Sequence, residues 1–257
     1  MRVVVDALSV RVGKAQLLED ISCVVGEGQW CTVVGPNGAG KTTLLNAIAG
    51  THRPTSGTVN IDGHDVHALG ERERAGRVAF VPQTPIIPAG MSVASYVLLG
   101  RIATTGVMRA PSTSDRALVD NVLDRLALRA LAERDVATLS GGERQRAVIA
   151  RALAQNTTTV ILDEPTTGLD IRHQMDVLEL LHVEVRECGL TVIASLHDLT
   201  LAGLYADHML LMREGHIALA DTPSRVVRSE ALAAAYETTL QVVTVDGRDI
   251  VIPAPAR

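Results

Sequence analysis

Five short runs of apolar and β-branched residues lie between turn-forming residues along the chain. The runs are CTVV at 31–34, VAFV at 78–81, TTVIL at 158–162, TVIAS at 191–195 and HMLLM at 208–212. Near-continuous apolar runs are typical of strands buried on both faces, because a strand with one solvent-facing side alternates apolar and polar positions. The pattern predicts an α/β fold in which helices cover a mostly parallel sheet.

A different periodicity holds in the stretch 90–156. Its apolar residues recur at the spacing of one helix face, as in Leu118, Val122, Leu123 and Leu126. No pattern of a buried strand is evident there. We therefore predict an inserted α-helical subdomain at 90–156, a catalytic core of 1–89 and 157–257, and a single domain spanning 1–257.

Local signals predict the C-terminal elements. Pro223 suits the first turn of a helix, and Ser229 suits the N-cap of a second helix at 230–237. The stretch VTVDGRDIVI carries Asp246-Gly247 between apolar runs, which is typical of a tight hairpin. We expect a closing hairpin after the last helix.

Composition and charge narrow the class of protein. The 257 residues are 47% hydrophobic and carry a net charge of -5, so the basic excess of a nucleic-acid-binding protein is absent from this sequence. The cysteines, Cys23, Cys31 and Cys188, are odd in number and lack metal-ligand spacing, which suits a reducing compartment. Asp6 interrupts any signal-like apolar start, and no apolar run is long enough to span a bilayer. We expect no nucleic-acid partner, and a membrane only through other subunits.

The stretch GPNGAGKTT combines glycine, lysine and hydroxyl side chains between a predicted strand and a predicted helix. Gly38 and Gly40 allow backbone N–H groups to turn inward at a helix N-terminus, where an anion binds well. Lys41 adds a charge for the β- and γ-phosphates, and Thr42 offers a hydroxyl to Mg2+. The candidate nucleotide-binding residues are Gly35, Pro36, Asn37, Gly38, Ala39, Gly40, Lys41, Thr42 and Thr43.

Two acids end the predicted strand TTVIL. Asp163 suits the orientation of Mg2+, and Glu164 suits a general base that polarises the attacking water. Together with the phosphate loop they predict a Mg2+-dependent nucleoside triphosphatase. His64 and His67 are close in sequence but have no evident third ligand, and we assign no zinc to them.

The stretch LSGGERQR at 139–146 resembles the signature motif of ATP-binding-cassette (ABC) ATPases. Gln83 in FVPQ, Asp170 in TTGLD and His197 in SLHD are similar to further motifs of that family and follow in its order. The resemblance covers essentially the whole chain. It implies a P-loop NTPase (RecA-like) core with a mostly parallel sheet, an N-terminal antiparallel β part and the inserted helical subdomain.

The resemblance also implies roles at the site. ATP and Mg2+ are the expected cofactors, with Glu164, His197 and Gln83 as catalytic residues and Thr42, Gln83 and Asp163 as Mg2+ ligands. Two copies are expected to pair head to tail as a homodimer, with Asp170 communicating between them. The residues expected to contact ATP held by the other copy are Ser140, Gly141, Gly142 and Glu143.

The sequence departs from the family at the residue that faces adenine. Val12 stands where the family usually has an aromatic residue, and the chain is only 2% aromatic. A valine lacks the ring face of a stacking partner. We predict weak base discrimination through Val12, and the alternative that Arg11 covers the base stays open because a guanidinium also stacks.

The finer resemblance is to importer ATPases for iron-siderophore complexes, haem and cobalamin. It implies transmembrane permease subunits, indirectly an extracytoplasmic substrate-binding protein, and a location at the cytoplasmic face of the cell membrane. The segment 84–101 is expected to contact the permease, unless its apolar residues form a local core. A zinc or manganese importer, an exporter and a soluble non-transport ABC protein are alternatives. A GTPase or small-molecule kinase would lack LSGGERQR.

Overall fold

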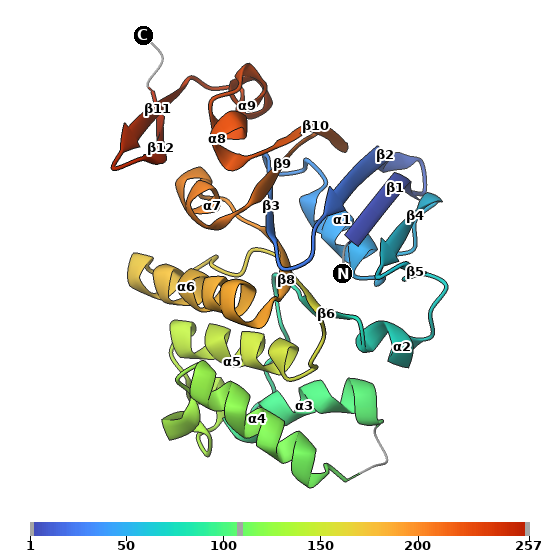
Figure 1. Ribbon diagram of the computed structural model, residues 1–257, viewed down its shortest axis with the longest axis vertical. Coiled ribbons are helices and arrows are strands. Elements are labelled where there is room, and N and C mark those ends of the chain that lie inside the picture. Colours follow the sequence, from blue (N-terminus) through green and yellow to red (C-terminus); the bar gives the residue numbers. More distant parts are fainter. Residues whose placement is uncertain (1–2, 107–109, 255–257) are drawn as a thin grey trace.

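The computed structural model describes residues 3–106 and 110–254 and is centred on a six-stranded sheet (Figure 1). The sheet consists of β3 (Trp30–Val34), β6 (Val78–Val81), β7 (Thr159–Leu162), β8 (Thr191–Ser195), β9 (His208–Arg213) and β10 (His216–Asp221). The strand order is β10-β9-β3-β8-β7-β6. All neighbours pair in parallel except β9 with β10. Each predicted buried run lies in this sheet, so the predicted α/β architecture is confirmed.

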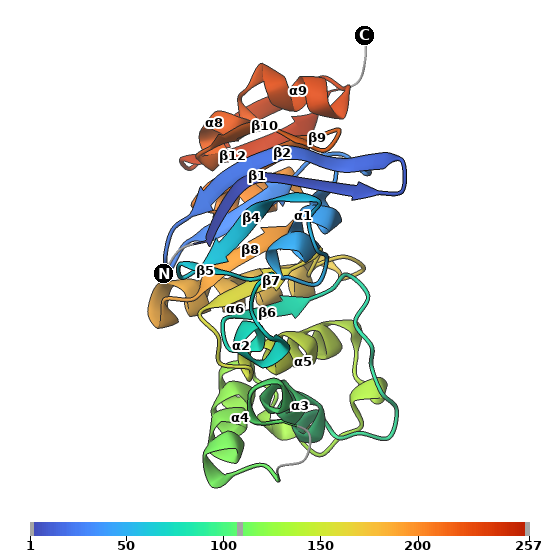
Figure 2. The same ribbon diagram turned by 90° about the vertical axis from the view of Figure 1, so that its right-hand side faces the viewer.

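A second sheet is antiparallel, and its strands come from the chain on both sides of the phosphate loop. It has the order β2-β1-β4-β5 and consists of β1 (Val3–Val12), β2 (Ala15–Val25), β4 (Ser56–Ile61) and β5 (His64–Asp65). Helix α1 (Lys41–Ile48) lies between the two sheets (Figures 1 and 2). Leu44 and Leu45 of α1 are fully buried in one cluster with Val33 of β3 and Leu8 of β1. The predicted N-terminal antiparallel part is confirmed, and its packing fixes the start of α1.

Helices occupy the stretch in which helical periodicity was noted. After the short α2 (Glu71–Ala75), the chain forms α3 (Val93–Thr105), α4 (Thr113–Arg125), the 3-10 turns η1 (Arg129–Leu131) and η2 (Val136–Thr138), and α5 (Gly141–Leu153). No strand lies between residues 90 and 156 where the structure describes them, apart from one isolated bridge of Ser92 with Asp135. These helices form the end of the molecule farthest from the C-terminus (Figure 1).

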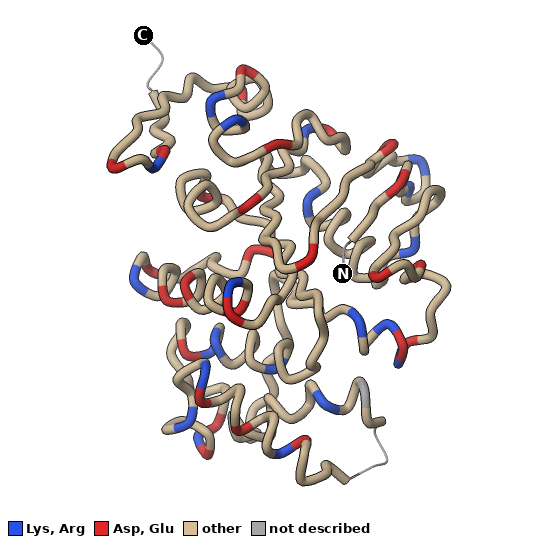
Figure 3. The backbone as a smooth tube through the Cα atoms, viewed as in Figure 1, with Lys and Arg blue, Asp and Glu red and all other residues tan. Residues whose placement is uncertain are grey.

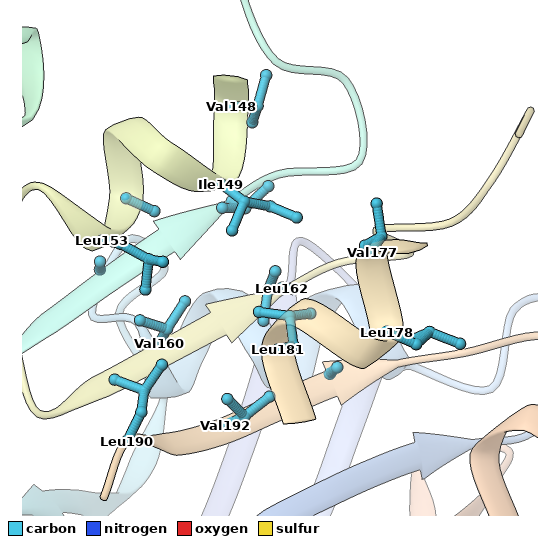
Figure 4. Close-up of a cluster of buried hydrophobic side chains, with 14 of the residues drawn as sticks. Val148, Ile149, Leu153, Val160, Leu162, Val177, Leu178, Leu181, Leu190 and Val192 are labelled. Atoms are coloured by element: carbon cyan, nitrogen blue, oxygen red, sulfur yellow. The ribbon is translucent and has the colours of Figure 1, made fainter. Parts of the chain in front are cut away.

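The helical part is joined to the sheet by a continuous apolar core. Helix α5 packs against β6 and α6 (Ile171–Cys188), and its apolar side chains share one core with those of β7 and β8 (Figure 4). The contacting side chains include Val148, Ile149 and Leu153 of α5, Val160 and Leu162 of β7, and Val177, Leu178 and Leu181 of α6. Because α5 and α6 share one core with β7, the start of α5 is held at a defined place relative to β7.

The C-terminal part follows the local signals of the sequence. Thr222 and Pro223 open α8 (Pro223–Val227), and the Ser229 hydroxyl accepts a hydrogen bond from the Leu232 N–H at the start of α9 (Glu230–Tyr236). The hairpin of β11 (Leu240–Val245) and β12 (Arg248–Pro253) turns at Asp246-Gly247, whose φ angles are 49° and 76°. Positive φ at both turn residues is the geometry that Asp-Gly favours. The predicted helices and hairpin are confirmed.

Charged residues of both signs are interspersed along the chain (Figure 3). Among them, Glu184 of α6 is unusual because its side chain is only 5% exposed. Both of its carboxylate oxygens accept hydrogen bonds from the Arg125 guanidinium of α4, with Nε 2.9 Å from Oε1. A bidentate pair of this kind joins α4 to α6 and satisfies a buried charge.

We expect Arg125→Ala to lower the free energy of unfolding by about 2 kcal/mol, because it leaves the Glu184 carboxylate buried without its partner. Urea unfolding measures the change. Arg129→Ala is the matched control, since the Arg129 and Asp124 side chains are 49% and 55% exposed. An exposed pair contributes less than about 1 kcal/mol. If both variants lost the same free energy of unfolding, the stabilising role of the buried pair would be contradicted.

Candidate functional site

The phosphate loop runs from the end of β3 to the start of α1. Gly38 has φ +81° and Gly40, the N-cap of α1, has φ +102°. A Cβ at Gly40 would lie 2.8 Å from Cδ2 of Leu18 in β2. Glycine is therefore required there both by the backbone conformation and by the packing. The loop residues from Gly35 to Thr43 lie together as the sequence spacing predicts.

Lys41 is folded back onto this loop. Its side chain is largely buried, and its Nζ donates to the carbonyl oxygens of Gly35, at 2.7 Å, and Pro36, at 3.0 Å. Burial lowers the pKa of Lys41, and the carboxylates of Glu164 and Asp163 act in the opposite sense. The acceptors that hold the ammonium group are thus neutral carbonyl oxygens. An anionic ligand would accept a stronger hydrogen bond from Lys41 than these carbonyls do.

The acids at the end of β7 are tied to β8. Asp163 is 2% exposed, and its Oδ1 accepts a hydrogen bond from the Ser195 hydroxyl at 2.7 Å. The same hydroxyl oxygen accepts from the Glu164 N–H at 2.8 Å. Parallel strands bring their carboxyl ends to one sheet edge, so β7 and β8 deliver these side chains beside the phosphate loop of β3.

Glu164 gathers the other residues predicted to be catalytic. Its Oε2 accepts from Nε2 of Gln83 at 2.6 Å and from the Thr167 hydroxyl at 3.0 Å. Its Oε1 lies 2.6 Å from Nε2 of His197. Gln83, Glu164 and His197 come from the ends of β6, β7 and β8, and the structure brings the three together. Glu164 itself has φ +50°, a conformation that non-glycine residues adopt mainly where surrounding contacts hold them.

A cavity of about 720 Å³ lies between the loop and this cluster. Its size suits a nucleotide-sized ligand. The residues already predicted from sequence that line it are Asn37, Gly38, Gly40, Lys41, Thr42, Thr43, Gln83, Glu164 and His197. Sequence reasoning missed four further lining residues, namely Gln16, Leu17, Glu214 and Gly215.

The missed residues come from β2 and from the β9–β10 turn. The Gly215 N–H donates to the Ala39 carbonyl at 3.0 Å, and the Gly215 carbonyl accepts from the Glu19 N–H at 3.0 Å. This turn therefore fastens the phosphate loop to β2. The sequence does contain a signal for the turn itself. Glu214-Gly215 stands between the apolar run at 208–212 and a run of alternating apolar and polar residues, which is typical of a hairpin turn. Its place beside the loop depends on long-range pairing that no local pattern reports.

Val12 lies at the end of β1, beside the β1–β2 turn, and is 52% exposed. It is not among the residues that line the cavity, whereas Gln16 of the same hairpin is. The Arg11 Nε donates to Oε1 of Gln16 at 2.9 Å, and Nε2 of Gln16 donates to the Leu18 carbonyl at 2.6 Å. The hairpin thus connects the Arg11 guanidinium to a residue of the cavity wall.

The signature residues form a second, separate cluster at the start of α5. The Ser140 hydroxyl caps the helix by accepting from the Glu143 N–H at 3.4 Å, and Oε2 of Glu143 accepts from the Ser140 N–H at 2.9 Å. The Ser140 hydroxyl also donates to Oε2 of Glu143 at 2.8 Å, and the two hydrogen bonds that this carboxylate accepts from Ser140 lower the pKa of Glu143. Such a reciprocal box satisfies the first N–H groups of the helix.

The signature cluster contacts the start of α6. Asp170 caps α6 by accepting from the His173 N–H at 2.9 Å, and its Oδ1 also lies 2.7 Å from Nδ1 of His173. A Cβ at Gly142 would lie 2.2 Å from Cδ2 of His173, so the glycine permits a close approach. Neither Asp170 nor any residue from Ser140 to Glu143 lines the cavity that holds Lys41.

The donors expected for Mg2+ are oxygen atoms of the kind that this ion prefers, namely the Thr42 hydroxyl, the Gln83 amide and the Asp163 carboxylate. Thr42 and Gln83 line the cavity, and Asp163 precedes Glu164 in the chain. The residues therefore fit the ion. Over residues 3–106 and 110–254, no group of three or more His, Cys, Asp or Glu side chains is arranged to hold a metal.

The rings of His64 and His67 face different backbone carbonyls. His64 Nδ1 is 2.8 Å from the Asp62 carbonyl oxygen, and His67 Nε2 is 2.9 Å from the Ala47 carbonyl oxygen.

The helices in the described ranges are all too short or too polar to cross a membrane.

Comparison with known proteins gives a consistent result. A family model described as "ABC transporter" matches residues 18–167. The chain is 38% identical over 255 residues to the cobalamin import ATP-binding protein BtuD of Halobacterium salinarum, covering 98% of this chain and 64% of that protein. It is 36% identical over 250 residues to the ferric enterobactin transport ATP-binding protein FepC of Escherichia coli, covering 96% and 92%.

Solved structures of ATP-binding cassettes share the fold. The ATP-binding cassette MJ0796, whose structure is a post-hydrolysis dimer bound to ADP and Pi, superposes with a TM-score of 0.75 at 27% identity, covering 86% of this chain and 98% of that one. The predicted cassette fold, with its parallel core, antiparallel β part and helical insertion, is confirmed. From the sequence match and the shared fold together, the chain belongs to the ABC transporter family.

Proposed function

We propose that this chain is the ATP-hydrolysing subunit of an ABC transporter and works as a homodimer around two ATP molecules. The observation that supports this most directly is the contact of Glu164 with both Gln83 and His197 across a cavity from Lys41. A base, an orienting amide and an imidazole beside a phosphate loop are the parts that phosphoryl transfer to water requires.

In the proposed reaction, the loop N–H groups and Lys41 bind the β- and γ-phosphates. Lys41 exchanges the carbonyl oxygens of Gly35 and Pro36 for phosphate oxygens, which are stronger acceptors because they are charged. Glu164 takes the proton of the attacking water, and His197 holds the γ-phosphate and that water in line. As the bond from water to the γ-phosphorus forms, the bond from that phosphorus to the bridging oxygen breaks and ADP leaves. Mg2+, held by Thr42, Gln83 and Asp163, would supply charge neutralisation on the phosphates.

The dimer follows from the separation of the two clusters. Ser140 and the following glycines form an N-terminal helix site for an anion but do not line the cavity of their own chain. A second copy facing head to tail would bring Ser140, Gly141, Gly142 and Glu143 to the γ-phosphate from outside. In this proposal Asp170 carries the communication between copies, because it caps α6 beside the signature cluster.

Glu164→Gln should keep the size and the hydrogen-bonding reach of the side chain but remove the base. We expect ATP turnover to fall at least about a hundredfold, and ATP to hold the variant as a dimer. Gel filtration with saturating ATP and a phosphate-release assay measure the two effects.

Glu179→Gln on α6 is the matched control for this substitution. Glu179 accepts a hydrogen bond from Tyr205 and does not line the phosphate cavity. A Glu164→Gln protein that stays monomeric with ATP would count against the dimer, and one that hydrolyses normally would count against Glu164 as the base.

The segment 84–101 supports a contact with permease subunits. Its apolar residues range from fully buried to exposed, and most are partly buried against the core. Val93, Tyr96 and Val97 are fully buried in the local core, whereas Ile86 is 84% exposed. The proposed docking contact therefore depends on Ile86 and its neighbours rather than on the whole segment.

We expect Ile86→Ser to weaken co-purification with the permease while leaving the ATPase rate of the isolated subunit unchanged. Removing one exposed apolar side chain from a contact lowers its affinity without changing the core. Ile252→Ser on the C-terminal hairpin, where Ile252 is 43% exposed, is the control. If both variants remain bound to the permease equally well, Ile86 is not part of the contact.

Base recognition is proposed to be weak because Val12 offers no aromatic face. We expect Val12→Tyr to bind ATP about two- to tenfold more tightly, as one added stacking contact would allow. Isothermal titration with MgATP tests this, and Val24→Tyr is the control because Val24 is 57% exposed elsewhere on the N-terminal sheet. Unchanged affinity would favour the alternative in which Arg11, held by Gln16, already covers the base.

The cargo proposed is an iron-siderophore complex, haem or cobalamin. The names of the BtuD and FepC relatives, a cobalamin import protein and a ferric enterobactin transport protein, support this class. The chain would lie at the cytoplasmic face of the membrane through its permease partners, and an extracytoplasmic binding protein would deliver the cargo to them. The net charge of -5 fits a partner other than nucleic acid.

A further inference from the structure

We propose that Tyr236 is a positioning residue for the phosphate loop, through which the C-terminal helix α9 controls the affinity for nucleotide. The Tyr236 hydroxyl oxygen accepts a hydrogen bond from the Gly35 N–H at 3.0 Å, although 201 positions separate the two residues. Gly35 is the first residue of the loop that binds phosphate in the proposed function, and the inference rests on that function.

Gly35 depends on contacts from outside the loop. Its φ is +147°, and a Cβ there would lie 2.3 Å from the Met212 carbonyl oxygen of β9. Only glycine fits so close to β9. Glycine is also the residue with the most conformational freedom to lose, so its native conformation needs hydrogen bonds to hold it.

Gly35 is held from both sides. Its N–H is bound by Tyr236, and its carbonyl accepts from Lys41 Nζ at 2.7 Å. The N–H and the carbonyl lie on either side of the two rotatable backbone bonds of Gly35. Holding both groups therefore fixes the φ and ψ angles of the residue. When Lys41 turns to a phosphate, the second of these bonds is lost. The Tyr236 bond then remains to hold the start of the loop in the geometry that binds the anion.

The environment of Tyr236 suits this role. The ring packs, partly buried, against the main apolar core, and burial raises the pKa of Tyr236 while the Gly35 N–H acts in the opposite sense. The hydroxyl is therefore neutral at physiological pH, and its oxygen stays a fixed acceptor. A buried N–H that lost this acceptor would have no water to replace it easily.

The same C-terminal part contacts the other side of the site. The Val251 N–H of β12 donates to the Thr200 hydroxyl at 3.1 Å, and Thr200 lies in α7 (Leu199–Tyr205), the helix that begins just after His197. In Figures 1 and 2 the segment from α8 to β12 lies along β9, β10 and α7. The C-terminal segment thus contacts both the loop that carries Lys41 and the helix that follows His197.

Tyr236→Phe tests the proposal because it removes the hydroxyl and keeps the ring. We expect MgATP and MgADP to bind about threefold to tenfold more weakly, the effect of losing one hydrogen bond. KM for ATP should rise while kcat changes less, since the groups that carry out hydrolysis are untouched. Isothermal titration and steady-state kinetics on the full chain measure these values.

Tyr205→Phe is the matched control. Tyr205 is also largely buried, and its hydroxyl donates to Oε2 of Glu179 at 3.2 Å, so the substitution removes a comparable hydrogen bond outside the cavity. Both variants should lose similar thermal stability, but only Tyr236→Phe should lose affinity. Parental affinity in Tyr236→Phe, or an equal loss in Tyr205→Phe, would overturn the proposal.

Hydrogen exchange at the Gly35 amide gives a second test that needs no stable variant. In the nucleotide-free parent this amide should exchange slowly, and an unprotected Gly35 N–H would overturn the proposal. Where Tyr236→Phe folds, its Gly35 amide should exchange faster than in Tyr205→Phe. A parent that does not bind MgATP would contradict the proposed function, whereas the exchange at Gly35 would still report on Tyr236.

Discussion

Parallel pairing of β3 with β8 and of β8 with β7 is the constraint on which the site depends. The register sets Val33 beside Ser195 and Leu162 beside Ala194, so the three strands end at one edge of the sheet. The phosphate loop leaves β3 at that edge, the two acids leave β7 and His197 follows β8. A shift of one strand by one residue would turn its side chains to the opposite face and separate the acids from the loop.

Two cores hold this edge in place from opposite faces. Helix α1 packs between the central sheet and the N-terminal sheet, and α5 and α6 pack on the other face. Because α5 begins at the signature residues and α6 begins at Asp170, the second core also fixes the cluster that the proposed dimer uses. Interiors are close-packed and transmit small displacements. Ser140 and Asp170 therefore stand at the starts of two helices that one core holds.

The sequence predicted most of the fold and the residues at the strand ends. Buried strands such as β7 and β8 appear as continuous apolar runs, and helix starts such as those of α8 and α9 have short-range capping signals, so local patterns sufficed. Gln16 and Glu214 could not be predicted in this way, because they reach the cavity through pairing of segments far apart in the chain. The contact of Tyr236 with Gly35 is of the same kind. The apolar residues of segment 84–101 could not be divided into core and surface, since the pattern does not say which way Ile86 points.

The donors around Glu164 limit how a water molecule can approach its carboxylate. A carboxylate has about four lone-pair sites for donors, and Gln83, Thr167 and His197 already lie at hydrogen-bonding distance from its oxygens. About one acceptor site is therefore left for the water of the proposed reaction. The three donors thereby restrict the direction from which that water can reach the carboxylate.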